Sequence, residues 1–272
     1  MKGLAGLWDC HFHVFDDPAG AAQRGVELNP TQKGTVQELL DVLDSHGVER
    51  GLAVGAAPYG TDNTVLVEAL AAAGGRLRGI AVVDPAISDR DFARLVEAGV
   101  VGTRMNLMTW GVGQLVEPGA DRLLHRLREA GWFLQLHVAK DDLLPAIPIL
   151  ERSGVRLMFD HVGRPDPRRG PDQPGFAAML ELGRSTDAVL KLSGPYRWSH
   201  TGSPYDDVEP FVAAAIEAFT LDRCVWGSDW PFTNPPAPME YEQQLSWIRR
   251  ILPDPADQLR VLRQNPVRLF DG

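Results

Sequence analysis

Residues 132–161 read WFLQLHVAKDDLLPAIPILERSGVRLMFDH, and they contain one complete repeat of a strand, a helix and a second strand. The apolar runs Trp132–Val138 and Val155–His161 are both typical of buried β-strands. Between these runs, apolar side chains recur at the spacing of one helix face, at Leu143, Leu144, Ile147 and Leu150. A helix that separates two such strands favours a parallel pair joined by a crossover.

The same alternation runs along the whole chain. Six further runs predict strands, at Leu7–Val14, Gly51–Ala56, Arg78–Val83, Val101–Leu107, Ala188–Ser193 and Cys224–Asp229. Helical spacing between them is clearest at Val36/Leu39/Leu40/Leu43 and Leu123/Leu124/Leu127. Eight strands, each followed by a helix, predict a (β/α)8 TIM barrel. A doubly wound sheet is the alternative, but no glycine-rich phosphate turn follows the first strand.

Composition narrows the class of protein. No linker or repeat divides the 272 residues, so we expect residues 1–272 to form a single domain. The formal net charge of −9 gives no footprint for nucleic acid or an anionic membrane. His11 and His13 fall where the apolar core of a signal peptide would lie. With only two cysteines, Cys10 and Cys224, we expect buried thiols in a reducing, cytoplasmic compartment.

Side chains that bind metals or move protons recur at the C-terminal ends of the predicted strands. The first strand carries Asp9, His11 and His13, which the period-2 alternation places on one face. Three later strands end with similar side chains: His137 on the fifth, His161 on the sixth and Asp229 on the eighth. Because barrel enzymes build their active sites at this end of the strands, we expect these residues to converge.

Neutral imidazole and carboxylate groups suit a divalent cation such as Zn²⁺ that keeps an open position for water. Considered alone, His11 and His13 could equally fill a structural role in the core. Their recurrence with His and Asp at three other strand ends favours a functional site. The remaining histidines lie in predicted helices or loops without such partners, and we expect surface positions for His46, His125 and His200.

Arginine is the second informative residue type. Arg104 lies in the fourth predicted strand, Arg164 follows His161 by three residues, and Arg197 follows the seventh strand. Guanidinium groups bind carboxylates through two parallel hydrogen bonds, so several at one end of a barrel predict an anionic substrate. The alternative is that some of them pair with a structural Asp160 or Asp166. Asn234, Tyr196, Trp198 and Trp110 are further candidates for contact with a substrate.

The motifs around these residues resemble those of the amidohydrolase superfamily. The stretches that carry the resemblance are Asp9–Phe15 (DCHFHVF), Phe159–Asp166 (FDHVGRPD), Lys191–Gly194 (KLSG), Val225–Pro231 (VWGSDWP) and Asn265–Phe270 (NPVRLF). They look like the branch that contains 2-pyrone-4,6-dicarboxylate lactonase and sugar-acid lactonases. The resemblance extends from about Asp9 to Phe270, which is nearly the whole chain.

Two positions bear on whether a metal is needed. Dinuclear members of the superfamily carry a carboxylated Lys or a Glu on the fourth strand, where this chain has Arg104, so the resemblance argues against two metals. His137 completes the ligand set of the mononuclear members, which the resemblance implies is His11, His13, His137 and Asp229. We therefore expect either no strict cofactor requirement or one divalent metal, Zn²⁺ or Mn²⁺. An arginine near the site favours a metal-independent lactonase that can capture Zn²⁺.

The resemblance implies a hydrolase that opens a lactone bearing a carboxylate. Asp229 would take the proton from the attacking water, and His11, His13 and His161 would stabilise the charge on the carbonyl oxygen. Substrate binding is expected from Arg104, Arg164, Arg197, Asn234 and Tyr196. One alternative is a metal-dependent non-oxidative decarboxylase of an unsaturated or aromatic acid. Another is a non-catalytic barrel that binds a small anion.

Overall fold

The computed structural model describes residues 6–16 and 32–271, together with residues 19, 22, 25, 27 and 28. These residues form two compact units. One comprises the described residues up to Val82, together with Leu95–Val100 and everything from Val225 onward. The other comprises Val83–Arg94 and Val101–Cys224. The prediction of a single domain over residues 1–272 stays a prediction.

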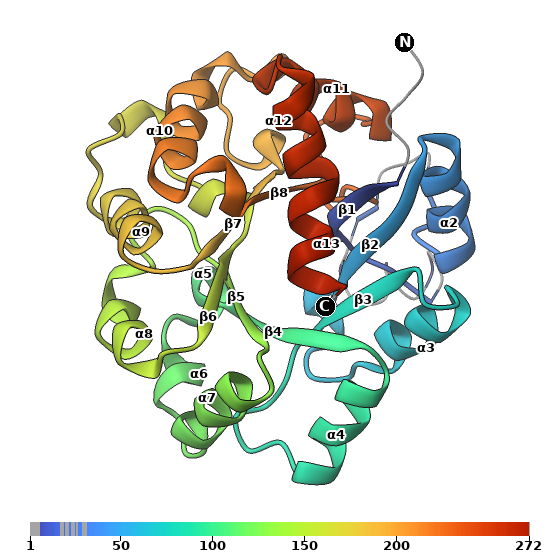
Figure 1. Cartoon of the computed structure of the whole chain (residues 1–272), viewed down its shortest axis with the longest axis vertical. Coiled ribbons are helices and arrows are strands. Elements are labelled where there is room, and N and C mark those ends of the chain that lie inside the picture. The colour runs from blue at the N-terminus through green and yellow to red at the C-terminus, as the bar shows by residue number, and fades with distance from the viewer. Residues whose placement is uncertain are drawn as a thin grey trace. The chain divides into compact units, whose positions relative to one another are not determined.

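All eight predicted strands are present (Figure 1). Their bounds are β1 Leu7–Phe12, β2 Val48–Val54, β3 Leu77–Ala81, β4 Val100–Asn106, β5 Phe133–His137, β6 Arg156–Phe159, β7 Val189–Ser193 and β8 Cys224–Gly227. In the sheet the strands follow one another in chain order from β1 to β8. A doubly wound sheet would reverse its strand order at a switch point, so chain order excludes that alternative. The fold is a (β/α)8 barrel.

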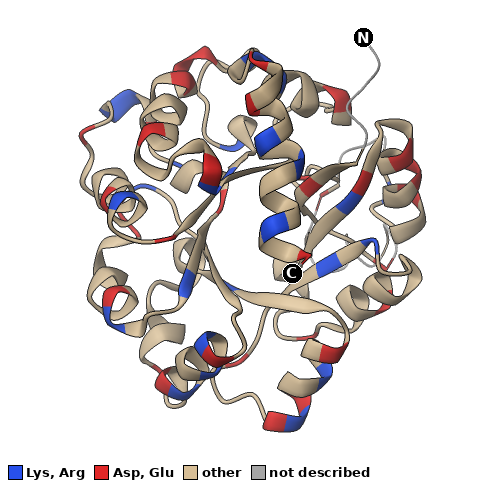
Figure 2. Cartoon of the chain, viewed as in Figure 1, with Lys and Arg blue, Asp and Glu red and all other residues tan. Residues whose placement is uncertain are grey.

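Helices follow the strands, as the periodicity predicts (Figure 1). Their bounds are α2 Val36–Ser45, α3 Thr64–Ala72, α4 Asp89–Glu97, α5 Leu107–Trp110, α6 Gly113–Val116, α7 Ala120–Glu129, α8 Ile147–Ser153, α9 Pro174–Ser185, α10 Glu209–Phe219, α11 Tyr241–Ile251, α12 Pro255–Leu259 and α13 Asn265–Phe270. Helices α4 and α7 carry charged side chains of both signs on their outer turns (Figure 2). Among the described residues, none of the helices combines the length and the apolar character that a membrane span requires.

The apolar faces that the sequence predicts are the buried ones. Leu39 and Leu43 of α2 and Leu123 and Leu127 of α7 are completely buried. Helix α2 begins after the N-cap residue Thr35, whose side chain accepts a hydrogen bond from the backbone N–H of Glu38. Cys10 and Cys224 are buried and form no disulfide, as predicted.

One predicted helix is shorter than its apolar spacing suggests. Leu143 and Leu144 belong to the expected face, but α8 begins only at Ile147. Two prolines explain the difference: Pro145 lies in a 3-10 turn ahead of the helix, and Pro148 lies in the first helical turn. A proline cannot donate the backbone hydrogen bond of a helix interior, so it confines the helix to the residues that follow it.

The predicted strands also end earlier at the positions that matter for function. His13 follows the end of β1, His161 follows β6 and Asp229 follows β8. His161 and Asp229 have φ values of 49° and 65°, in the left-handed region that a strand cannot accommodate. These side chains therefore project from the turn that follows each strand.

Candidate active site

The unit that contains β1 and β8 brings together His11, His13 and Asp229. The Nε2 atoms of His11 and His13 lie 3.7 and 3.8 Å from Oδ1 of Asp229. His11 and Asp229 are completely buried, and His13 is 5% exposed. The two imidazole rings meet edge to face, with centroids 5.1 Å apart. The structure therefore brings these three of the predicted site residues together.

The backbone places this group. The N–H of Asp229 donates to the carbonyl of His11 at 2.7 Å, and the N–H of His13 donates to the carbonyl of Trp230 at 2.8 Å. Gly227 allows this close approach, because a Cβ at that position would lie 2.4 Å from the Cβ of His11. The left-handed conformation of Asp229 costs conformational energy, which is typical of residues held in place for function.

The buried carboxylate of Asp9 forms hydrogen bonds with the backbone around His11 and Asp229. Its Oδ1 accepts hydrogen bonds from the backbone N–H of His11 at 3.1 Å and of Ser228 at 2.9 Å. Its Oδ2 accepts the hydroxyl hydrogen of Tyr241, in α11, at 2.9 Å. Burial raises the pKa of Asp9 to about 6, and these hydrogen bonds oppose the rise. Asp9 thereby links the backbone of His11 to that of Ser228, the residue that precedes Asp229.

The donor set of this group fits a divalent cation. One nitrogen from each histidine and one oxygen of Asp229 lie within 4.8 Å of one another. Nδ1 of His13 lies 2.8 Å from the carbonyl oxygen of Val54, which can only accept, so the proton is on Nδ1 and the Nε2 lone pair faces Asp229. This orientation is characteristic of metal-binding histidines. Two ligands of tetrahedral Zn²⁺ lie roughly 3.3 Å apart, a few tenths of an ångström closer than the present distances.

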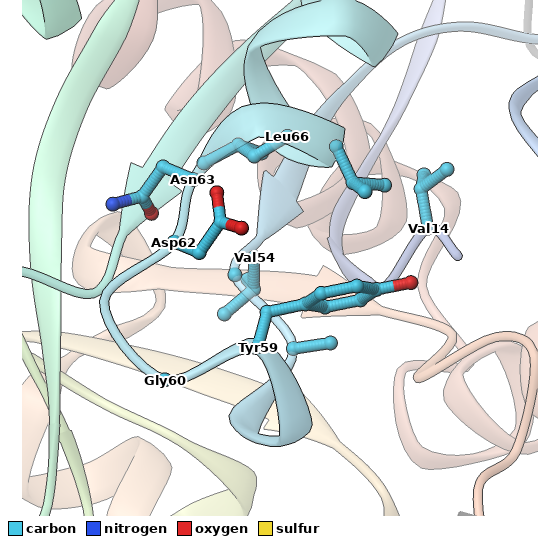
Figure 3. Close-up of a pocket in the computed structure, with 10 residues that line it drawn as sticks. Val14, Val54, Tyr59, Gly60, Asp62, Asn63 and Leu66 are labelled. Atoms are coloured by element: carbon cyan, nitrogen blue, oxygen red, sulfur yellow. The ribbon is translucent and has the colours of Figure 1, made fainter. Parts of the chain in front are cut away.

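A small pocket adjoins the carbonyl that orients His13. Figure 3 shows Val14, Val54, Tyr59 and Asn63 around it, beyond the ends of β1 and β2. Its volume is about 10 Å³, which is room for roughly one water molecule. The Tyr59 hydroxyl donates to Asp16 at 2.5 Å, which ties the pocket wall to the loop that follows His13. With a volume of about 10 Å³, the pocket is too small for a lactone ring.

The unit that contains β4 to β7 holds a second group of polar residues, centred on Asp160. Nε of Arg104 donates to Oδ2 of Asp160 at 3.0 Å, and the Gln135 amide donates to the same oxygen at 2.9 Å. Nζ of Lys191 donates to Oε1 of Gln135 at 2.7 Å and lies 3.5 Å from Oδ1 of Asp160. Asp160, Gln135 and Lys191 are completely buried, and Arg104 is 6% exposed.

Charge decides the protonation state of Asp160. Burial by itself would raise its pKa, but the neighbouring Lys191 and Arg104 cations hold the pKa well below its ordinary value. The pairing of Arg104 with Asp160 is the structural alternative that the sequence leaves open for this arginine. It accounts for Nε of Arg104, while another guanidinium nitrogen of the same side chain reaches His137.

His137, predicted as a fourth metal ligand, lies in a different environment. The guanidinium of Arg104 contacts its Nδ1, and NH1 of Arg164 lies 3.0 Å from its Nε2. Burial lowers the pKa of His137 well below its ordinary value, and Arg104 and His161 act in the same direction, against Asp160. The ring is thus neutral, and each of its nitrogens faces a cation.

His161 is held from the neighbouring strand end. Its Nδ1 lies 2.9 Å from the hydroxyl oxygen of Ser193, the last residue of β7. Gly194 follows, with φ of 57°, and a Cβ there would lie 2.7 Å from the same nitrogen. The KLSG stretch of the sequence therefore supplies a hydroxyl partner and the space that the imidazole needs. The rings of His161 and His137 meet edge to face, with their centroids 5.7 Å apart.

The other predicted substrate-binding residues occupy varied positions. Arg164 is half-buried, and its NH2 donates to the carbonyl of Arg197 at 3.3 Å. The Arg197 guanidinium lies 5.0 Å from the centre of the buried Tyr196 ring. Asn234 is exposed, and both its backbone and its side chain bond the backbone of Glu27. The contacts of Asn234 are those of a loop anchor, and its predicted substrate contact stays a prediction.

Sequence reasoning missed the polar residues that support the candidate ligands. Gln135 and Lys191 lie inside predicted strands, and each stands among apolar residues, in LQL and LKL. A charged or amide side chain at an inward position of a barrel strand needs a partner. That signal could have identified both residues. Of the histidines predicted at the surface, His125 and His200 are exposed, while His46 is partly buried and its ring lies against Tyr241.

The chain matches the family model described as amidohydrolase over residues 8–272. The chain belongs to the amidohydrolase family. This match confirms the resemblance that the histidine and aspartate motifs indicate. It covers β1 to β8, and so both groups of residues lie within it.

Individual relatives are similar over nearly their full length. The 2-pyrone-4,6-dicarboxylate hydrolase of Comamonas testosteroni is 32% identical over 281 aligned residues, which cover 99% of this chain and 92% of the relative. The 4-sulfomuconolactone hydrolase of Rhizobium radiobacter is 31% identical, with 97% and 90% covered. A crystal structure of a probable 2-pyrone-4,6-dicarboxylic acid hydrolase from Acinetobacter baumannii, with citric acid bound, has a TM-score of 0.87 at 29% identity, with 98% and 100% covered.

Proposed function

We propose that this amidohydrolase opens a lactone that bears at least one carboxylate. The observation that carries the proposal is a buried carboxylate, Asp229, whose Oδ1 lies within 3.8 Å of two imidazole nitrogens. The two relatives are hydrolases whose names give a dicarboxylate and a sulfonated lactone as substrates. Each group contains residues that follow the C-terminal end of a strand, Asp229 after β8 and Asp160 after β6, and (β/α)8 enzymes place their active sites at this end of the strands.

Asp229 acts as the general base in this proposal. It accepts a proton from the water that attacks the lactone carbonyl, and it later returns this proton to the leaving oxygen. The backbone N–H of Asp229 donates to the carbonyl of His11, and the backbone N–H of His11 donates to Asp9, so the backbone of β1 sets the position of the base. Imidazole N–H groups, from His161 in particular, stabilise negative charge on the carbonyl oxygen.

A divalent metal fits the donor set, and His11, His13 and Asp229 would hold it. When bound, such an ion supplies a Lewis acid and lowers the pKa of a coordinated water. We propose that the ion is not strictly required. What supports this proposal is that Asp229 can serve as a base by itself, while the group around Asp160 supplies positive charge from arginine and lysine. The environment of His137, between two guanidinium groups, also disfavours a four-residue ligand set.

The arginines bind the carboxylate of the substrate in this proposal. The group formed by Arg104, Arg164, Lys191 and Asp160 contains three cations and one carboxylate, which is a formal charge of +2. A positive cluster at the end of the strands attracts an anionic substrate and fixes its orientation. Arg104 and Arg164 are the members proposed to contact the carboxylate, because a guanidinium group presents several N–H donors in one plane.

The experiment is a panel of matched lactones, with and without a carboxylate, assayed for the ring-opened hydroxy acid. Arg104→Met should lower kcat/KM by about 10- to 100-fold towards a carboxylated lactone, because one charge-assisted pair is lost. The loss towards a neutral lactone of the same ring size should be small. Arg94→Met, at an exposed position of α4, is the matched control. Equal losses on both lactones would show that Arg104 is structural and would contradict the proposed binding of an anion.

A further inference from the structure

His137 stands between two arginines, one in strand β4 and one in the loop that follows β6. Arg104 lies in β4 and contacts Nδ1 of the ring, and Arg164 follows β6 and lies 3.0 Å from Nε2. The strand register explains the first contact, because Arg104 is opposite Gln135 and His137 is the next residue on the same face of β5. His137 is 8% exposed, so the ring contacts the arginines where little water reaches it.

Hydrogen-bond chemistry makes this arrangement unusual for a histidine. A neutral imidazole has one N–H and one acceptor nitrogen, whereas a guanidinium group only donates. The ring can therefore accept a hydrogen bond from one arginine, and its own N–H faces the other arginine. The contact between the ring and that second guanidinium is therefore not a hydrogen bond, and an anionic acceptor beside the ring would be favourable for both guanidinium groups. A carboxylate oxygen, which accepts several hydrogen bonds, fits this requirement.

Each guanidinium is also anchored on the side away from the ring. Nε of Arg104 donates to Asp160 at 3.0 Å, and NH2 of Arg164 donates to the carbonyl of Arg197 at 3.3 Å. NH1 of Arg164 also lies 3.2 Å from the sulfur of Met108, which is a weak acceptor. These anchors fix one side of each group, and the imidazole fixes the spacing between the two groups.

We propose that His137 is a positioning residue, which spaces the Arg104 and Arg164 guanidinium groups to bind the carboxylate of the substrate and is not a metal ligand. The inference rests on the proposed function, because the carboxylate belongs to the lactone. It assigns a role in specificity to a position that the family motif predicts as a ligand. Replacement of His137 should therefore alter substrate binding and leave metal affinity unchanged.

The first test compares kinetic constants. His137→Leu, which removes both ring nitrogens, should raise KM for a carboxylated lactone by about tenfold and change kcat by less than about threefold. The constants for the matched neutral lactone should not change. His137→Asn places an amide oxygen near the position of Nδ1, where it can accept from Arg104, and should recover part of the loss. His125→Leu, an exposed histidine of α7, is the matched control.

The second test measures Zn²⁺ affinity directly by titration of the chelator-treated protein. His13→Gln should weaken Zn²⁺ binding by at least about tenfold, because it removes one of three donors. His137→Asn and His137→Leu should bind Zn²⁺ as tightly as the wild type. Loss of Zn²⁺ affinity in the His137 variants, or equal kinetic losses on charged and neutral lactones, would overturn the proposal.

A binding experiment separates this proposal from the proposed function. Glutarate is a dicarboxylate without a lactone ring, and its dissociation constant can be measured by calorimetry even if no lactone is hydrolysed. The constant should rise by about tenfold in His137→Leu and by less in His137→Asn. An unchanged constant would overturn the role of His137. Binding that weakens as expected in a protein without lactonase activity would contradict only the proposed function.

Discussion

Asp9 and Asp160 are both completely buried, yet the two units give these carboxyl groups opposite properties. Asp9 is surrounded by neutral donors, which are the Ser228 and Tyr241 hydroxyls and two backbone N–H groups, and burial raises its pKa to about 6. Asp160 faces Arg104 and Lys191, and its pKa lies well below the ordinary value. Burial alone therefore does not decide the charge of a carboxyl group. The partners decide it.

The same contrast describes the chemistry available in each unit. The group around Asp229 contains histidines and a carboxylate, which are the side chains that most often serve as general acids and bases. The group around Asp160 contains arginines and a lysine that stay charged at any physiological pH. The first arrangement suits proton transfer and the second suits the binding of an anion. Four predictions test this division, from the largest expected effect to the smallest.

The largest effect is expected from Asp160→Asn. This substitution leaves Lys191 and Arg104 buried without their carboxylate, and loss of one partner of a buried ion pair typically costs about 3–5 kcal/mol. The free energy of unfolding, measured by denaturant titration, should fall by that amount at pH 7. In the wild type, the free energy of unfolding should fall as the pH is lowered towards the pKa of Asp160. The reason is that a carboxyl group with a depressed pKa in the folded state stabilises the fold only while it is ionised.

An exposed ion pair provides the control for this variant. Arg76 lies 2.6 Å from Asp44, whose side chain is 63% exposed. Asp44→Asn makes the same chemical change but should cost about 1 kcal/mol or less, because water screens the pair. If Asp160→Asn costs no more than Asp44→Asn, the cations around Asp160 find other partners and the contrast between the two carboxyl groups fails.

The second prediction concerns the proton-transfer group. Asp229→Asn should lower kcat by about 10²-fold or more, the usual contribution of a positioned general base, while the protein remains folded. Single-turnover rates with a carboxylated lactone would measure the chemical step. A variant with nearly wild-type turnover would remove Asp229 from the mechanism.

The third prediction concerns removal of metal. Chelator-treated protein, with its zinc and manganese content verified by elemental analysis, should keep at least about a tenth of its activity if Asp229 can act without an ion. Addition of Zn²⁺ up to one equivalent should then change the rate only modestly. Complete loss on chelation, with recovery at one Zn²⁺ or Mn²⁺ per chain, would instead show that the His11–His13–Asp229 group functions as a metal centre.

Sequence patterns predict where the strands and the candidate site residues lie in the chain better than they predict which side chains contact one another. Every strand was identifiable, because apolar runs bounded by turns reflect local chemistry. His11, His13 and Asp229 were identifiable because their types and strand-end positions are both visible in the sequence. The sequence left a pairing of Arg104 with Asp160 open, but the contact with Lys191 was not identifiable, since Lys191 is distant in the chain and only the fold brings it to Asp160. The left-handed turns at His161 and Asp229 were also missed: Asp and His are enriched at positive φ, but both residues end runs whose apolar pattern predicts a strand.

The last prediction returns to Asp9 and has the smallest expected effect. Because its folded pKa is raised, the folded state binds more protons than the unfolded state between about pH 4 and pH 6, so the wild type loses stability as the pH rises through this range. Asp9→Asn removes this titration, while the amide oxygen can still accept from His11 and Ser228. The stability of the variant relative to the wild type should therefore increase by about 1 kcal/mol from pH 5 to pH 7.

Chelator-treated protein should be used for this comparison, so that metal binding at His11 does not contribute to the pH dependence. Denaturant unfolding of wild type and variant at both pH values gives the required difference. The exposed Asp44→Asn is the matched control, and its stability relative to the wild type should be the same at pH 5 and pH 7. If the difference between Asp9→Asn and the wild type is the same at both pH values, the Asp9 carboxyl group is not held against ionisation. Asp9 and Asp160 would then differ in their hydrogen-bond partners but not in the direction of their pKa shifts.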